Sequence, residues 1–339
     1  MKIFRAIHAI LLLLAGCFNS IHNDIPPNQI AMKSEAREEK AMYYYLRGQS
    51  FEAEGNLSEA KKMYANVGKY YLETDIAPQA FHAHARLLLK QNKFEEAFEK
   101  LKFITKNYVN YEKYSQVILE EFEIACSLMK RFETKSNWKV LSIFKDPEPI
   151  IECFKHIVAM APYSENAPKS LFYIAQLEYT YGDKMKAIEA LDRLMNDYPA
   201  SDYLPDAYLL QAKIFLSFVN SAQNDQGMTK KAIDCYEDFL VLFGNRNDLN
   251  EKIQQAKCGL ENVRNLYAES RLVLGDFYLY RCHYPEGAVV FYNEARVLAP
   301  VSKISAIAEK RMDFINSGKA TPANWADFCF GKVIYKPVR

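Results

Sequence analysis

The chain has 339 residues, half of them apolar and a quarter charged, with a formal net charge of +1. This length and composition suffice for a large buried core, which excludes a disordered protein. The 43 basic residues nearly balance the 42 acidic ones, so we expect no nucleic-acid partner. Glycine and proline are sparse and tyrosine occurs 23 times, which favours packed helices over short strands.

The first residues have the pattern of an export signal. Lys2 and Arg5 precede an apolar run from Ile7 to Leu14, which is well short of the ~20 residues that span a bilayer. The sequence Leu14-Ala15-Gly16-Cys17 resembles the lipobox of bacterial lipoproteins. That resemblance implies a lipoprotein signal peptide over 1–16 and a diacylglycerol, with further acyl chains such as palmitate, on Cys17. The alternative is an ordinary secretory signal with a chance cysteine, but the A-x-A cleavage pattern is absent.

A polar stretch follows over 17–34, with Pro26-Pro27 and no periodicity, and it predicts a lipidated flexible tether. Helical periodicity then runs over 35–316, in segments that come in pairs. Three of these pairs, at 41–74, 78–111 and 168–201, resemble tetratricopeptide repeats, which are 34-residue helix-turn-helix units. Small residues at positions 8 and 20 let the two helices approach, and bulky residues fill the gaps beside them. These small residues are Gly48 and Ala60, Ala85 and Ala97, and Ala175 and Ala187, and the bulky ones include Tyr44, Phe51, Tyr64, Phe81, Leu88, Leu101, Leu171 and Leu191.

Weaker copies and irregular segments lie between and after these units. Residues 150–162 fit a second half-unit, residues 208–239 a unit with an insertion, and a last unit places Gly287 and Phe291 in its second helix. Residues 115–145 predict a long helix and a loop, and 246–266 an added helix. The expected fold is all-α, an irregular α-solenoid of five to six repeats. The alternative is a generic bundle of amphipathic helices.

The first helices of such repeats line a concave groove that can hold an extended peptide. Repeat positions 2, 5, 9, 12 and 13 usually face it, which makes Tyr45, Gln49, His82, Arg86 and Lys90 the candidate peptide-binding residues. Arg86 and Lys90 lie one turn apart and would hold a peptide carboxylate. The alternative is an ordinary solvated helix face.

Enzymatic and metal chemistry find little support in the sequence. It contains no phosphate loop, nucleophile elbow or His-Glu-x-x-His motif, so we expect no enzyme and no cofactor besides the lipid on Cys17. His82 and His84 are two residues apart and point to different sides of a helix, so they cannot share a metal ion. The six cysteines after Cys17 show no CxxC spacing, and we expect buried thiols.

Residues 317–339 depart from the repeat pattern and carry Trp325, Phe328, Phe330 and Tyr335. Aromatic residues are unusual in a disordered end. We expect this C-terminal aromatic tail to pack on the last helices or to meet a partner.

A lipobox joined to a chain-long irregular tetratricopeptide solenoid resembles the BamD family of outer-membrane assembly lipoproteins. This resemblance implies a scaffold, anchored by lipid at the periplasmic face of the outer membrane. Its implied partners are unfolded outer-membrane β-barrel proteins and the barrel subunit BamA. The alternative is a periplasmic tetratricopeptide lipoprotein that organises peptidoglycan enzymes or a division complex.

Overall fold

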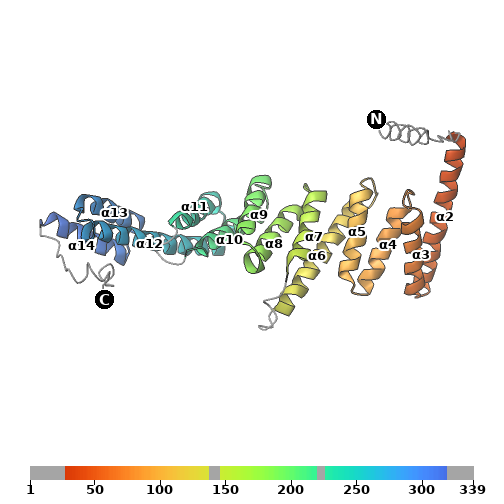
Figure 1. Ribbon diagram of the computed structural model, residues 1–339, viewed down its shortest axis with the longest axis horizontal. Coiled ribbons are helices and arrows are strands. Elements are labelled where there is room, and N and C mark those ends of the chain that lie inside the picture. The colour runs from red at the N-terminus through yellow and green to blue at the C-terminus, as the bar shows by residue number, and fades with distance from the viewer. Residues whose placement is uncertain (1–26, 137–145, 220–225, 319–339) are drawn as a thin grey trace, which may run out of the picture. The chain divides into compact units, whose positions relative to one another are not determined.

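The computed structural model describes residues 27–136, 146–219 and 226–318 (Figure 1). The predicted signal peptide, Cys17, Cys329 and nearly all of the aromatic tail lie outside these residues. Throughout the described ranges the regular structure is helical, with α-helices α2 to α14 and one short 3-10 helix. Contacts divide the chain into two compact units, Met1–Glu120 and Glu121–Arg339.

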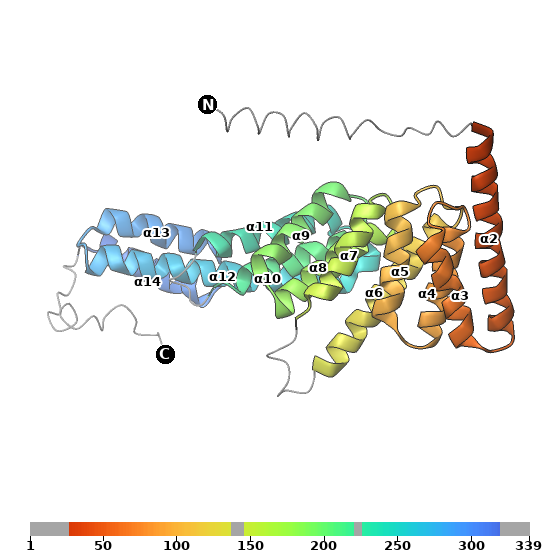
Figure 2. The same cartoon turned by 45° about the vertical axis from the view of Figure 1, so that its right-hand side comes forward.

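The first unit consists of successive helices, of which the first four pack against their neighbours in the sequence (Figure 2). They are α2 (Pro27–Ala53), α3 (Leu57–Tyr70), α4 (Ala77–Lys90), α5 (Phe94–Asn107) and the start of α6 (Tyr114–Ser136). Helix α2 begins before residue 35, so residues 27–34 are helical and not part of an extended tether. Proline is favourable in the first helical turn, where its missing N–H has no partner to lose.

The close approach of α2 and α3 rests on the small residues of the repeat. A Cβ atom on Gly48 would lie 2.5 Å from Cε1 of Tyr64, so only glycine fits there. Ala60 is fully buried and Tyr64 is 1% exposed. The next pair, α4 and α5, buries Ala85 and Ala97 completely in the same way. These positions confirm the predicted register of the first two repeats.

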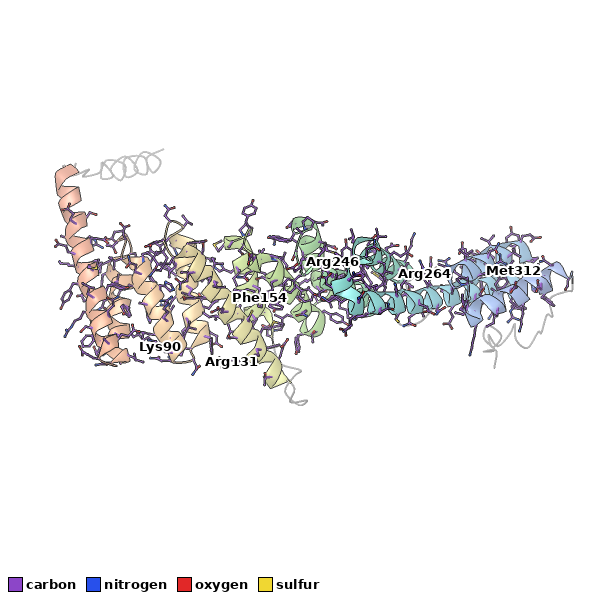
Figure 3. The ribbon with its side chains drawn as sticks, turned by 180° about the vertical axis from the view of Figure 1, so that it is seen from behind. Lys90, Arg131, Phe154, Arg246, Arg264 and Met312 are labelled. Atoms are coloured by element: carbon purple, nitrogen blue, oxygen red, sulfur yellow. The ribbon has the colours of Figure 1, made fainter. Side chains whose placement is uncertain are left out.

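The second unit continues the pattern from the rest of α6. Its helices are α7 (Glu148–Met160), α8 (Asn166–Tyr181), α9 (Lys184–Asp197), α10 (Leu204–Leu216), α11 (Gln226–Phe243), α12 (Asn250–Tyr280), α13 (Pro285–Leu298) and α14 (Lys303–Asn316), with the 3-10 helix η2 (Asn247–Leu249) before α12. Phe154 of α7 (Figure 3) is fully buried. The centroid of its ring lies 6.1 Å from that of Phe122 of α6. Ala175 and Ala187 are buried where α8 and α9 meet.

Helix α12 differs from the sequence prediction. The expected added helix and the first helix of the last repeat form one continuous helix of 31 residues. One end of α12 packs on α11, where a Cβ on Gly259 would lie 2.5 Å from Tyr236 Cζ. Its other end packs on α13, where a Cβ on Gly275 would lie 2.6 Å from Tyr292 Cε1. Helix α12 therefore packs in one helix pair with α11 and in the next with α13.

The last repeat is also shifted by one residue. Ala288 and Tyr292 are fully buried, whereas the predicted positions Gly287 and Phe291 are only partly buried. The turn before α13 holds one residue more than the turn between α2 and α3, and His283 adopts a left-handed φ of 50° within it. The prediction at Gly287 and Phe291 is therefore wrong, because it assumed a turn of standard length.

A tyrosine that follows the second helix of a repeat forms a hydrogen bond to the chain just after the preceding helix pair. In the first unit the Tyr108 hydroxyl donates to the carbonyl of Leu72 at 2.7 Å. In the second unit the Tyr198 hydroxyl donates to the carbonyl of Pro162, also at 2.7 Å. Both bonds join residues 36 positions apart, so each bond connects one repeat to the next. The all-α repeat solenoid predicted from the sequence is thus confirmed for the described residues.

Candidate functional site

The five predicted groove residues lie on two helices of the first unit. Tyr45 and Gln49 are one turn apart on α2, and His82, Arg86 and Lys90 follow one another at intervals of four residues on α4. Residues three or four apart share a helix face. The sequence prediction therefore places each set on one face of its helix, but the environments of the five side chains differ.

His82 is buried, with 3% of its surface exposed, so its ring is not open to a peptide. Its Nε2 lies 2.8 Å from Oε2 of Glu120, and its Nδ1 lies 3.2 Å from the hydroxyl of Tyr111. A carboxylate only accepts, so Nε2 donates to Glu120 and Nδ1 accepts from Tyr111 in the neutral ring. The placement of His82 as an exposed groove residue is therefore corrected: it links α4 to α6.

Arg86 is exposed but already bound to the same carboxylate. Its Nη2 donates to Oε1 of Glu120 at 2.8 Å. Burial alone would raise the pKa of Glu120, but the hydrogen bonds from His82 and Arg86 outweigh it and hold that pKa below its usual value. Glu120 therefore stays ionised and neutralises Arg86.

Lys90 has an acidic partner of its own. Its Nζ lies 2.7 Å from Oε1 of Glu52 on α2, and Oε2 of Glu52 accepts a hydrogen bond from Tyr64 at 3.1 Å. Burial, followed by the Glu52 carboxylate, raises the pKa of Tyr64, so this hydroxyl remains a donor. The Tyr45 ring packs 5.8 Å from that of Tyr64.

On the α2–α4 face, the two cations Arg86 and Lys90 are therefore each paired with a carboxylate. A peptide carboxylate would have to displace Glu120 from Arg86 or Glu52 from Lys90. Exposed ion pairs are individually weak, so such displacement brings little net free energy. What this face offers to a ligand is the half-buried ring of Tyr45 and the exposed amide of Gln49.

A second face, on α8, was not singled out from the sequence. Repeat positions 2, 9 and 12 of the unit at 168–201 are Lys169, Gln176 and Tyr179, and the rule that selected the α2 and α4 residues would have found them. The ammonium of Lys169 lies 5.2 Å from the centroid of the Phe122 ring and 5.9 Å from that of Tyr173.

The surroundings of these side chains set them apart from the first unit. Lys169 also lies 5.9 Å from the centroid of the Tyr203 ring, and Lys213 of α10 lies 5.4 Å from that of Tyr179. Within the described ranges neither lysine forms an ion pair with a carboxylate. Burial alone would lower the pKa of Lys169, but its interactions with Tyr173 and Tyr203, which include a hydrogen bond to Tyr203, outweigh burial and raise that pKa.

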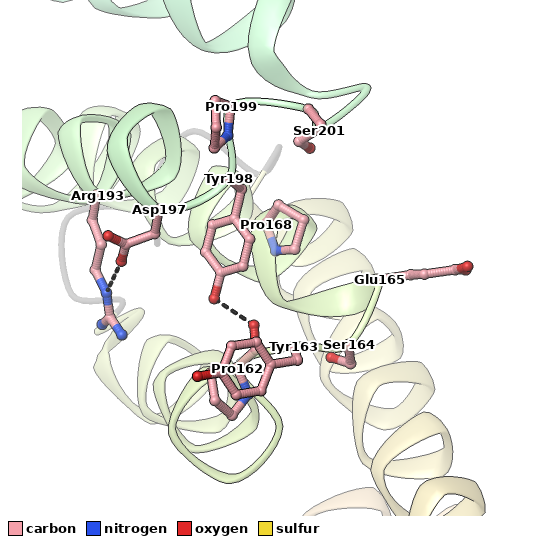
Figure 4. A pocket seen from close by; sticks show the side chains of 11 residues that line it. Pro162, Tyr163, Ser164, Glu165, Pro168, Arg193, Asp197, Tyr198, Pro199 and Ser201 are labelled. Atoms are coloured by element: carbon pink, nitrogen blue, oxygen red, sulfur yellow. Dashed lines mark hydrogen bonds and ion pairs between the residues drawn. The ribbon is translucent and has the colours of Figure 1, made fainter.

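A hollow of about 550 Å³ lies between the turn from α7 to α8 and the turn from α9 to α10 (Figure 4). The rings of Pro162, Pro168 and Pro199 contribute to its lining, with Tyr198 between them and Tyr163 fully exposed at its edge. The Tyr198 hydroxyl is occupied by its bond to Pro162, so that side chain presents its ring. Such a surface suits a small apolar group.

The cysteines and possible metal ligands are dispersed. Of the described cysteines Cys235 is buried, and burial raises the pKa of its thiol to about 12. Cys258 and Cys282 are exposed, so the expectation of buried thiols is wrong for these two. No group of three or more histidine, cysteine, aspartate or glutamate side chains in the described ranges is placed to hold a metal ion. None of the described helices is long and apolar enough to cross a membrane.

Comparison with protein-family models agrees with the repeat assignment. A tetratricopeptide-repeat family model matches residues 169–201, which include α8 and α9. Solved structures with similar chains include a tetratricopeptide-repeat protein from Parabacteroides merdae, at 13% identity and a TM-score of 0.30 over 81% of this chain and 98% of that one. Another is that of Pseudomonas aeruginosa pilF, at 13% identity and a TM-score of 0.28 over 84% and 100%.

Curated sequence relatives carry a more specific name. The outer membrane protein assembly factor BamD of Caulobacter vibrioides is 21% identical over 160 residues, which is 47% of each chain. BamD of Xylella fastidiosa is 24% identical over 167 residues, which is 47% of this chain and 52% of the relative. The chain thus spans about half the length of the curated relatives that it matches. Together with the helix-turn-helix repeats, these matches support a BamD-like tetratricopeptide-repeat protein.

Proposed function

We propose that this protein is a non-enzymatic scaffold in outer-membrane protein assembly, which binds unfolded β-barrel proteins and a BamA-type barrel subunit. The observation that carries the proposal is the match to three BamD sequences over about half the chain. The fold supports it, because stacked helical repeats present long surfaces for protein partners. On α2 the half-buried ring of Tyr45 and the exposed amide of Gln49 are open to an extended polypeptide.

Depletion of the protein in its own cells tests this function. The proposal predicts that folded barrel proteins in the outer membrane decrease, while their unfolded forms accumulate in the periplasm. Heat-modifiable mobility on gels separates the two forms, and a periplasmic protein without a barrel serves as the control. Normal levels of folded barrels with altered peptidoglycan structure would contradict the proposal and favour a scaffold for cell-wall enzymes.

The proposal includes a lipid anchor on Cys17 at the periplasmic face of the outer membrane. The lipobox-like sequence before Cys17 supports it, and two or more acyl chains hold a protein stably on a membrane. Labelling with a palmitate analogue should mark the wild type and the control variant Cys258→Ser, but not Cys17→Ser. Undiminished label in Cys17→Ser would refute the anchor.

A further inference from the structure

The side of α2 that faces away from α3 carries exposed apolar side chains. Tyr43 is 61% exposed and Leu46 is 54% exposed. They lie three residues apart and so share one side of the helix, roughly opposite Gly48, which meets α3. The ring of Tyr43 packs against that of Tyr44, with 5.6 Å between the centroids, so it is already restricted before any partner binds. We call the side that carries Glu39, Tyr43, Leu46 and Arg47 the outer face of α2.

The equivalent side of the next repeat is buried. Tyr43 precedes Gly48 by the same number of residues by which Ala80 precedes Ala85, so Tyr43 and Ala80 are equivalent. Ala80 is fully buried, in a core that includes Val67 of α3. This side of a first helix therefore packs on the preceding helix pair. Within the described residues α2 is the first helix, so its outer face lacks that cover. The end of a repeat stack normally has a polar outer face that keeps the protein soluble.

The charges on the outer face fit a second copy of the same helix. Glu39 lies four residues before Tyr43 and Arg47 lies four residues after it. Both are exposed, and in the described part of the chain neither forms an ion pair. The guanidinium of Arg47 lies 4.6 Å from the centroid of the Phe51 ring, which leaves its charge uncompensated. Glu39 and Arg47 are about 12 Å apart along the helix axis, too far to pair with each other.

We propose that the outer face of α2 is a self-association surface, through which two copies of this chain pair antiparallel about a two-fold axis at Tyr43. A two-fold interface has to be self-complementary. Opposite charges at equal distances on either side of the axis meet this condition, because Glu39 of each copy then lies opposite the partner's Arg47. The apolar side chains Tyr43 and Leu46 are covered between the two helices. This inference goes beyond the proposed function, since it concerns a second copy of the chain and not a client or a barrel subunit.

Sedimentation equilibrium of the full-length protein in a density-matched detergent measures this association. We expect the wild type to show an equilibrium between monomer and dimer. Glu39→Arg and Arg47→Glu should each raise the dimer Kd about tenfold, because each replaces two attractive contacts by two repulsive ones. The double variant Glu39→Arg/Arg47→Glu restores both contacts with the charges exchanged, and its Kd should return to within about threefold of the wild type.

A matched control separates this surface from a general effect of charge. Lys186→Glu reverses the charge of an exposed lysine on α9 and should leave the dimer Kd unchanged. A monomeric wild type would overturn the proposal, as would a double variant no tighter than the single ones or an equal loss in Lys186→Glu. No other cell component enters this assay. A monomeric protein whose depletion still lowers folded barrels would therefore refute the self-association surface and leave the proposed function intact.

Discussion

Substitution of Gly48 by alanine tests the packing of the first repeat, because two physical effects predict opposite signs. Alanine has the higher helix propensity, by about 0.8–1 kcal/mol, so a solvent-exposed site in α2 would be stabilised. In the structure, however, the new methyl group would lie 2.5, 2.8 and 3.0 Å from three ring atoms of Tyr64. That ring is 1% exposed and its hydroxyl is bound to Glu52, so it has no free space into which to move.

The balance of these effects gives the expected magnitude. Overpacking in a well-packed core costs about 1–3 kcal/mol. After the gain in helix propensity, Gly48→Ala should lower the free energy of unfolding of the first repeats by about 1–2 kcal/mol. Hydrogen exchange of the amides of α2 and α3 measures this local stability directly.

A matched double variant separates overpacking from other causes. Tyr64→Leu removes the ring that the methyl group meets, so Gly48→Ala should cost much less in that background. If Gly48→Ala instead leaves exchange unchanged or slows it, the helices do not meet at Gly48 and the repeat register is refuted.

Two further predictions concern charged and titratable groups of the first unit. Exposure alone predicts little effect of Arg86→Glu on stability, but this variant places a second carboxylate beside Glu120. We expect a loss of about 1–2 kcal/mol in urea unfolding, and wild-type stability would show that the pair contributes nothing. Burial, with the nearby Lys100 and Lys61, lowers the pKa of His84 to about 4. The unfolded chain therefore binds a proton at this histidine as the pH falls below about 6.5, while the folded chain does not, and stability is lost between pH 6.5 and 4. Replacement His84→Leu should reduce the loss between pH 7 and 5 by about 1–2 kcal/mol, and an unchanged pH dependence would contradict the assignment.

The repeats could be predicted because small residues at fixed spacing are a direct signature of helices in close contact. Gly48 and Ala60 identified the first pair, and Ala175 and Ala187 the pair that the repeat family model also matches. The register failed at Gly287, because one extra residue in a turn leaves the periodicity on either side unchanged. The continuity of α12 was missed, although residues 266–274 contain neither glycine nor proline to end a helix.

The candidate site was harder to predict than the fold. The helical faces of Arg86 and Lys90 follow from spacing, but their partners Glu120 and Glu52 are 34 and 38 residues away. Such pairs depend on how successive repeats stack, which no local pattern contains. The burial of His82 has the same origin. The α8 face could have been found by applying the groove positions to the third repeat, although the rings around its lysines could not.

Cross-linking in intact cell envelopes, followed by purification of the full-length protein and identification of its partners, tests the central claim most directly. A scaffold of barrel assembly should cross-link to a BamA-type barrel subunit and to unfolded barrel proteins, and Gly48→Ala should weaken the client cross-links if the first repeats hold them. Recovery of peptidoglycan enzymes or division proteins without any BamA-type subunit would contradict the proposed function.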